Sequence, residues 1–224
     1  MPFRVALTFD AEHPDRRHHE PDGVRAILGT LATHGARATF FLQGRWVEAE
    51  PDAARSIARA GHLIGSHAHY HTHMDLLSDV GFRTDIERAE RAIRDHVGID
   101  PHPWIRFPFG SAAADQHRLD HLRLELLRDL GYRHVGWHVE ARDWLTRATA
   151  CRMAALIIGG AMAHGDGAVV LLHTWPRPVA DALAIAVPTM IAEGATFVRV
   201  DELDLPPGLD PIAERQTAHP ARSR

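Results

Sequence analysis

Histidines occur in this sequence at a spacing that suits a metal site. His67 and His71 lie four residues apart within residues 66–73, and on a helical turn that spacing places both imidazoles on one face. His69 and His73 repeat the spacing. A solvated loop explains any one of these histidines, but two interleaved pairs directly after an apolar run favour a metal site. We therefore predict that His67 and His71 bind one cation.

Acidic and basic residues follow other apolar runs of the chain. Asp10 and Glu12 come after residues 3–9, and two carboxylates at such a place can supply a metal ligand and a general base. A turn or a helix cap is the ordinary role of a single Asp there. Arg106 can hold a carboxylate in a two-pronged geometry or form a surface ion pair. His173 ends another apolar run, where it is either a core residue or a catalytic one.

The elements that must position these residues alternate between strand and helix patterns. Seven segments are rich in apolar and β-prone residues, and they predict strands over 3–9, 38–42, 62–65, 104–107, 132–137, 168–172 and 196–200. Apolar residues at helical spacing predict helices over 24–34, 53–60, 86–97, 119–130 and 148–163, and a last one before residue 196. Such alternation is typical of a parallel sheet, open or closed into a barrel.

In parallel α/β folds, active sites form at the carboxyl ends of the strands. The polar residues that follow the predicted strands should therefore meet at one end of the sheet. This expectation brings the histidines, the acids and the arginine into one site.

Length and composition restrict the class of protein. The chain has 224 residues, 45% of them hydrophobic and 24% charged, which is ordinary for a globular protein. We predict a single catalytic domain over 1–205 and a flexible tail over 206–224. The net charge of -4 gives no support to nucleic-acid binding. Cys151 is the only cysteine, which excludes an internal disulfide framework and a cysteine-based zinc cluster.

The sequence also predicts where the protein works. An acidic residue at position 10 comes too early for the apolar core of a signal peptide, and no apolar stretch approaches the length of a membrane span. We therefore expect a cytoplasmic protein without a membrane partner. No pattern in the sequence indicates an oligomeric state.

Five short segments, in order along the chain, carry a family resemblance. They are residues 8–10 (Thr-Phe-Asp), 61–71 (Gly-x-x-Ile-Gly-x-His-x-x-x-His), 106–110 (Arg-Phe-Pro-Phe-Gly), 143–144 (Asp-Trp) and 171–173 (Leu-Leu-His). Together they resemble the motifs of the polysaccharide deacetylases of carbohydrate esterase family 4, also called the NodB homology domain. Any one motif is weak, but five in sequence are hard to reach by chance.

The resemblance implies a fold, a cofactor and a reaction. The fold is a distorted parallel (β/α)7 barrel. The cofactor is one divalent metal, often zinc, held by His67, His71 and a carboxylate. Two imidazoles and a carboxylate also suit Co, Ni or Fe. The reaction is hydrolysis of an acetyl group, usually from an N-acetylated sugar, and a small N-acetylated metabolite is an equally good expectation as substrate.

Three positions depart from the family pattern. Ala11 stands where most members have a second Asp, so Glu12 is the nearest acid that can replace it as a ligand. Ala68 replaces the usual Ser or Thr between the histidines, and Glu140 stands where an Asp is common. The Asp-x-Glu arrangement is similar to that of relatives acting on small amides or cyclic ureides. An allantoinase- or cyclic-imidase-like amidohydrolase is therefore one alternative, and a non-catalytic, His-rich metal-binding protein is another.

The resemblance also implies a division of labour among the site residues. Asp10 is the expected base that takes a proton from the attacking water, and Arg106 orients it. His173 is the expected acid for the departing nitrogen, and Asp143 orients His173 and favours its protonated form. Aromatic side chains should wall the pocket and exclude water, namely Phe109, Trp144 and Trp175.

Overall fold

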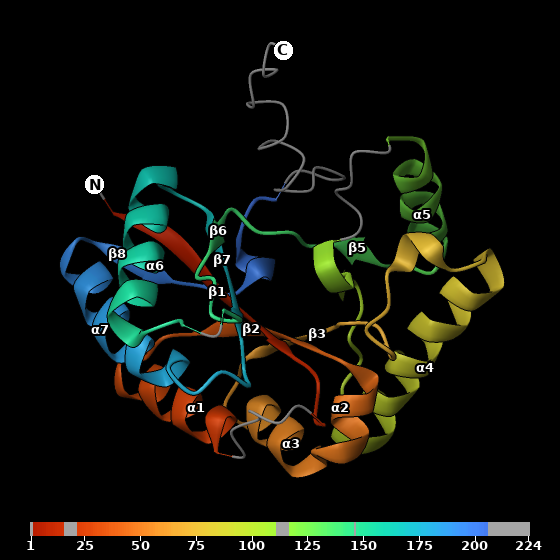
Figure 1. The fold of residues 1–224 in the computed structure, drawn as a ribbon, viewed down its shortest axis with the longest axis horizontal. Helices are drawn as coiled ribbons and strands as arrows, with labels where there is room; N and C mark the ends of the chain where they lie inside the picture. Colours follow the sequence, from red (N-terminus) through yellow and green to blue (C-terminus); the bar gives the residue numbers. More distant parts are fainter. Residues whose placement is uncertain (1, 16–21, 111–116, 146, 206–224) are drawn as a thin grey trace.

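A curled parallel sheet forms the centre of the molecule. The computed structural model describes residues 2–15, 22–110, 117–145 and 147–205. Within that part of the chain the sheet has eight strands: β1 (Phe3–Ala11), β2 (Ala38–Leu42), β3 (Leu63–Ser66), β4 (Trp104–Ile105), β5 (Arg133–His134), β6 (Val139–Glu140), β7 (Ala168–His173) and β8 (Ala195–Phe197). Their order is β5-β4-β3-β2-β1-β7-β6, and β8 pairs with the start of β1. The distorted, barrel-like parallel sheet predicted from the sequence is confirmed, as a curled half-barrel (Figure 1).

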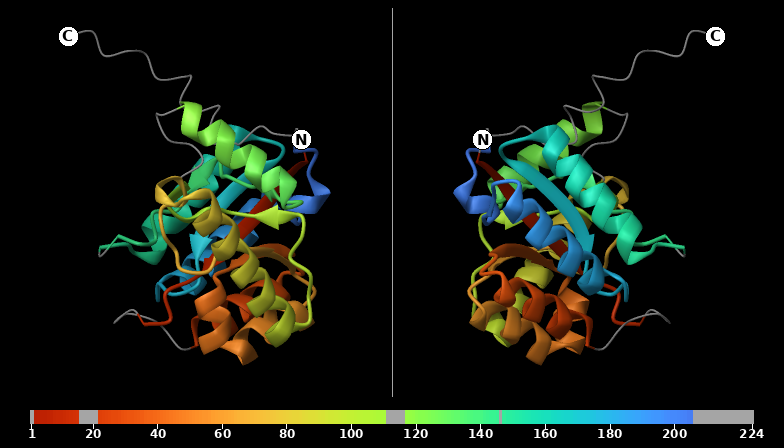
Figure 2. Two further views of the ribbon diagram at one scale, coloured as in Figure 1. Left: turned by 90° about the vertical axis from the view of Figure 1, so that its right-hand side faces the viewer. Right: turned by 90° about the vertical axis from the view of Figure 1, so that its left-hand side faces the viewer.

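Helices form the layer outside the sheet (Figures 1 and 2). They are α1 (Gly23–Thr33), α2 (Gly44–Ala49), α3 (Pro51–Arg59), α4 (Asp79–Val97), α5 (His117–Asp129), α6 (Ala150–His164) and α7 (Val179–Ala192). Short 3-10 turns occur at Met74–Leu76, Pro108–Gly110 and Val200–Glu202. Around the outside, α6 packs on α7, α7 on α1, α1 on α3 and α3 on α4. None of the described helices is both long enough and apolar enough to cross a membrane. The predicted tail over 206–224 lies outside the described residues.

Most helix predictions hold, with one omission. In α1 the spacing of apolar residues puts Val24, Ile27 and Leu31 on the buried face. Helix α4 ends at Gly98, whose φ of 76° lies in the left-handed region that favours glycine. The predicted helix over 53–60 is α3, whereas the six residues of α2 before it were not predicted. A helix of that length is too short to show a period of apolar residues.

The predicted strand over 132–137 is wrong in its extent. Within that segment only β5 (Arg133–His134) is a strand, and it pairs with β4. The next strand, β6, begins at Val139 and pairs with β7 at the other edge of the sheet. Between them, Val135 donates its backbone N–H to Ile105 at 2.8 Å and His138 donates to Val169 at 2.8 Å. One short run of chain therefore bonds to both edges and draws the sheet into its curl. A β pattern in the sequence does not show where one strand ends and the next begins here, because β5 and β6 are only two residues long each.

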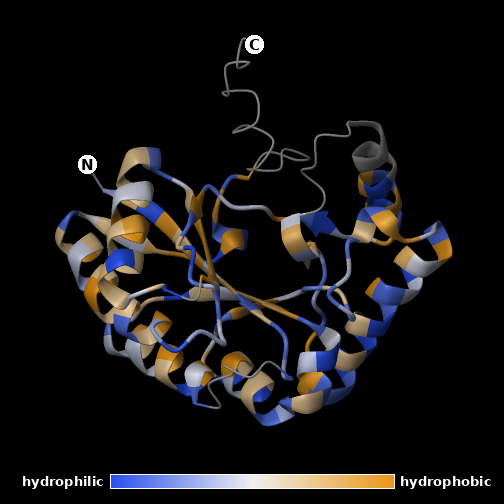
Figure 3. Ribbon diagram, viewed as in Figure 1, coloured by the Kyte–Doolittle hydropathy of each residue, from blue (hydrophilic) through white to orange (hydrophobic). Residues whose placement is uncertain are grey.

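Strand β1 has two buried faces, one apolar and the other polar toward its end. Val5, Leu7, Phe9 and Ala11 face the outer helices and belong to the main apolar core. The alternate residues face the inside of the curl, and after Ala6 they become polar. Because side chains alternate along a strand, the last inward-facing residues are Asp10 and Glu12. Colouring by hydropathy shows the apolar strands at the centre of the molecule (Figure 3).

Helix α6 approaches β6 closely through a glycine. A Cβ on Gly160 would overlap the side chain of Val139, whereas a Cβ on the neighbouring Gly159 would meet nothing within 4 Å. The close approach fixes β6, which carries Glu140 and leads to Asp143.

We predict opposite effects of the two glycine substitutions. Gly160→Ala should lower the free energy of unfolding by about 1–3 kcal/mol, because Val139 must move in a packed core. Gly159→Ala should raise it by roughly 0.5–1 kcal/mol, since alanine restricts the unfolded chain and fits the helix. Denaturant unfolding of both variants measures this, and equal stability of the two would show that the packing of α6 on β6 is wrong.

Candidate active site

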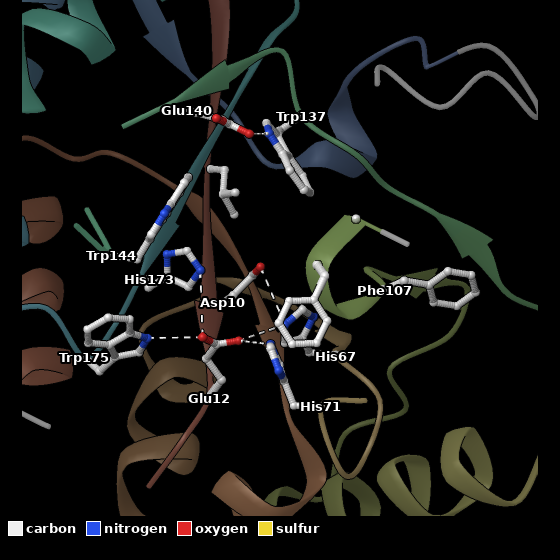
Figure 4. Close-up of a pocket in the computed structure, with 13 residues that line it drawn as sticks. Asp10, Glu12, His67, His71, Phe107, Trp137, Glu140, Trp144, His173 and Trp175 are labelled. Atoms are coloured by element: carbon white, nitrogen blue, oxygen red, sulfur yellow. Dashed lines mark hydrogen bonds and ion pairs between the residues drawn. The ribbon is translucent and has the colours of Figure 1, made fainter. Parts of the chain in front are cut away.

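A cavity of about 330 Å³ opens at the carboxyl ends of the strands. This volume is at the small end of the usual range for ligand pockets. Figure 4 shows the cavity, with polar groups on one side and aromatic side chains around them. The residues that line it are Asp10, Glu12, His67, His71, Phe107, Phe109, Gly110, Trp137, Glu140, Trp144, Leu171, His173 and Trp175.

Eight of the ten residues predicted for the site line this cavity. The other two, Arg106 and Asp143, lie directly behind it and hold residues that do line it. The structure therefore brings all ten together at one end of the sheet, from five separate segments of the chain.

Asp10 and Glu12 are the two acids at the end of β1. Each is only 3% exposed, and both face the cavity because Ala11 between them points into the outer core. Burial alone would raise the pKa of Glu12, but His67, His71 and a charged His173 hold this pKa well below its usual range. The cavity thus contains a buried carboxylate that stays ionised.

Arg106 fixes Asp10 from behind. Its Nη1 donates to Asp10 Oδ1 at 2.9 Å, while Nε and Nη2 donate to the carbonyls of Val135 and Gly136 at 3.0 Å each. The guanidinium is fully buried and lies over the ring of Phe41, 4.4 Å from its centroid. The run of chain between β5 and β6 therefore anchors the arginine that orients Asp10.

His67 presents one ring nitrogen to both acids. Its Nδ1 lies 2.8 Å from the carbonyl of Arg106, which can only accept, so Nδ1 carries a proton. Nε2 then faces Glu12 Oε2 at 3.2 Å and Asp10 Oδ2 at 3.7 Å. Burial lowers the pKa of His67, but the two carboxylates outweigh it and raise this pKa. The same field favours a cation at this place.

His71 reaches the same carboxylate, but not from a helix. Its Nε2 contacts Glu12 Oε2, and burial lowers its pKa, which favours the neutral imidazole that binds metals. The expected helical turn is wrong: residues 67–73 have no regular structure, and Ala68 and His71 have φ values of 58° and 56°. Two left-handed residues, rather than a helix, bring the imidazoles together.

The second predicted histidine pair does not form. His69 is fully buried beneath the loop, with Nε2 3.8 Å from Glu48, away from the cavity. His73 stacks on Phe109, with ring centroids 4.2 Å apart. The equal spacing of the two pairs in the sequence did not predict this difference, because the loop is not helical.

His13 is a neighbour of the site that the sequence analysis missed. One donor atom from each of Glu12, His13 and His71 lies within 4.8 Å of the other two. The Nε2 of His13 is 3.3 Å from Glu12 Oε1, on the side of the carboxylate away from His67. Its position directly after Glu12 was the signal in the sequence that could have drawn attention to it.

His173 lies across the cavity from the histidine loop, at the end of β7. Asp143 accepts two hydrogen bonds from His173, one from the backbone N–H at 2.6 Å and one from Nδ1 at 2.8 Å. Burial lowers the pKa of His173, but Asp143, Glu12 and Asp10 outweigh this and raise it to about 9. Its Nε2 points toward the cavity, 3.8 Å from Glu12 Oε1.

Aromatic side chains surround the polar groups. Phe109 and Trp144 are 58% and 37% exposed and stand at the mouth of the cavity. Trp175 is buried and does more than line the wall, because its Nε1 donates to Glu12 Oε1 at 3.2 Å. Trp137 donates to Glu140 at 2.9 Å on the side of the cavity opposite Glu12 (Figure 4).

The donor set fits a divalent metal. A carboxylate oxygen and two imidazole nitrogens converge from Glu12, His67 and His71, and His13 offers a further nitrogen. Such nitrogen and oxygen ligands suit zinc and its neighbours among the transition metals. Trp175 donates a hydrogen bond to Glu12, and the carbonyl of Arg106 accepts one from His67. Metal ligands are usually fixed by such hydrogen bonds from the surrounding residues.

Comparisons with known proteins agree with this geometry. The family model described as polysaccharide deacetylase matches residues 2–135. The peptidoglycan-N-acetylglucosamine deacetylase of Bacillus cereus is 29% identical over 203 residues, which are 89% of this chain and 67% of the relative.

Solved structures of the same family have a similar fold. A family 4 carbohydrate esterase from Streptomyces lividans, in complex with acetate, has a TM-score of 0.72 at 25% identity and covers 87% of this chain and 91% of its own. A mutant of BA3943, described as a family 4 pseudoenzyme with restored enzymatic activity, has a TM-score of 0.77 at 25% identity, covering 90% and 67%. Matched over more than half of its length by the family model, this chain belongs to the polysaccharide deacetylase family.

Proposed function

We propose that the protein is a metal-dependent hydrolase that removes the acetyl group from an N-acetylated sugar or a small N-acetylated metabolite. The observation that carries the proposal is the position of Asp10, buried and held by Arg106, beside the ligands Glu12, His67 and His71 and across the cavity from His173. A base, a metal site and an acid around one cavity are the groups that amide hydrolysis needs.

Glu12, His67 and His71 are the proposed metal ligands. A bound divalent metal would supply Lewis acidity, polarising the amide carbonyl and making a water molecule more acidic. Zinc suits the donor set, and cobalt, nickel and iron suit it too. Glu12 thereby serves as the carboxylate ligand in place of the second Asp that most family members have at the position of Ala11.

The side chains of the chain itself handle the protons. Asp10 accepts the proton of the attacking water through Oδ2, because Oδ1 is occupied by Arg106. His173 gives a proton from Nε2 to the departing nitrogen, since its Nδ1 is held by Asp143. The aromatic wall keeps bulk water out and leaves the two groups to act on a bound substrate.

The small cavity and its aromatic rim favour a compact acylated group. An N-acetyl group on a sugar ring fits such a site, because aromatic faces pack against the apolar faces of sugars while the acetyl group enters. The Bacillus cereus relative is named as a deacetylase of N-acetylglucosamine, which supports deacetylation over the cyclic-imidase alternative. The pseudoenzyme among the structural neighbours makes a direct test of turnover necessary.

Asp10→Asn tests the proposed reaction. The amide can still accept from Arg106 but cannot take a proton from water, so kcat should fall by about 10²–10⁴-fold while the protein keeps its zinc. Hydrolysis is measured on a panel of N-acetylated sugars, acetylated amines and cyclic imides, with metal content measured in parallel. Asp181→Asn, an exposed acid on α7, is the matched control and should behave like the wild type.

Two results would contradict the proposal. Full activity of Asp10→Asn would show that Asp10 is not the base. A wild-type preparation that carries zinc and hydrolyses nothing in the panel would favour the non-catalytic, metal-binding alternative.

The pH dependence of kcat tests the role of His173. An acid with a pKa of about 9 stays protonated at neutral pH, so the rate should fall as the pH rises through that value. Asp143→Asn removes the negative charge that raises the pKa of His173, so the fall in rate should move to lower pH. A pH profile of kcat for both proteins measures the shift, and an unchanged profile in Asp143→Asn would show that another group supplies the proton.

A further inference from the structure

We propose that Asp85 on α4 is a positioning residue that holds residues 67–71 in the shape that binds the metal. The inference deepens the proposed function, because it rests on His67 and His71 as metal ligands. Asp85 does not reach the cavity, so it acts only through the loop.

The carboxylate of Asp85 is buried and aimed at the loop. It is 4% exposed, and its Oδ2 accepts the backbone N–H of His69 at 2.8 Å while Oδ1 accepts that of Tyr70 at 3.2 Å. These are two consecutive amides between the two ligands. A buried carboxylate is costly unless its oxygens are hydrogen-bonded, and here both oxygens bond to the same short loop.

The start of α2 holds the loop from another direction. The backbone N–H of Gly44 donates to the carbonyl of Ala68 at 2.9 Å, and that of Arg45 donates to the carbonyl of His69 at 3.4 Å. A Cβ on Gly44 would overlap the ring of His69, so only glycine allows this approach. Helices α2 and α4 pack on each other, and together they bond four backbone groups of the loop.

The loop needs such support because its backbone is strained. Ala68 and His71 are both left-handed, a conformation that is unfavourable for a residue other than glycine. Ala68 also lacks a hydroxyl group that could bond within the loop. The hydrogen bonds to Asp85 and α2 therefore maintain the conformation in which the two imidazoles face Glu12.

Asp85→Asn is the test, with metal binding as the measurement. The substitution puts an NH₂ group against a backbone N–H and removes the charge, so the loop should loosen. The dissociation constants of Zn²⁺ and Co²⁺, measured by competition with a chromophoric chelator, should rise about 10–100-fold, as is usual when the supports of metal ligands are lost. The visible spectrum of bound Co²⁺ should change with them.

Two controls separate positioning from general stability. Asp95→Asn makes the same change at an exposed place on α4 and should leave both dissociation constants unchanged. Gly160→Ala destabilises the protein away from the loop and should also leave them unchanged. Unchanged metal binding in a folded Asp85→Asn, or equal weakening in Gly160→Ala, would overturn the proposal.

If Asp85→Asn does not fold, hydrogen exchange of the wild type tests whether Asp85 holds the loop. The amides of His69 and Tyr70 should exchange slowly in the metal-free protein, because Asp85 already holds them, and fast exchange would overturn the proposal. These measurements need no turnover. A protein that binds zinc through a loop held by Asp85 and yet hydrolyses nothing would contradict the proposed function alone.

Discussion

The rest of the site depends on two buried carboxylates at the end of β1, which need partners of opposite charge or hydrogen-bond donors. Alternation along the strand places Asp10 and Glu12 on the inner face while Ala11 joins the outer core. Burial of a carboxylate is costly unless it is paired. Arg106, His67, His71, Trp175 and His173, which come from three separate parts of the chain, supply that pairing. The polar groups of the site are therefore also the groups that allow these two acids to be buried.

The run of chain that joins the two edges of the curled sheet also contributes to this pairing. The chain between β5 and β6 bonds to both edges of the sheet, and its carbonyls at Val135 and Gly136 hold the guanidinium of Arg106. Left-handed residues other than glycine gather near the cavity in the described part of the chain, at His13, Ala68, His71, Phe109 and Arg142. Backbone strain is concentrated where side chains must converge, as is common at functional sites.

The sequence was sufficient to predict the parallel sheet, its strand-and-helix alternation and the meeting of the site residues, because strand ends in such a fold share one edge. It was insufficient wherever the backbone leaves regular structure. The helical turn expected at His67 and His71 is a strained loop. The strand expected over 132–137 ends at His134, and the chain then crosses to the other edge of the sheet, where β6 begins at Val139. His13 and Asp85 were missed because their places depend on a left-handed residue and on the packing of α4 against the loop, neither of which has a period in the sequence.

The central claim is that Glu12, in place of an acid at position 11, completes a metal site with His67 and His71. Anomalous X-ray diffraction from crystals grown with zinc tests it most directly. The account predicts one strong peak within bonding distance of Glu12, His67 and His71, beside Asp10. A peak held by Glu12, His13 and His71 with His67 turned away, or no peak at this end of the sheet, would contradict it.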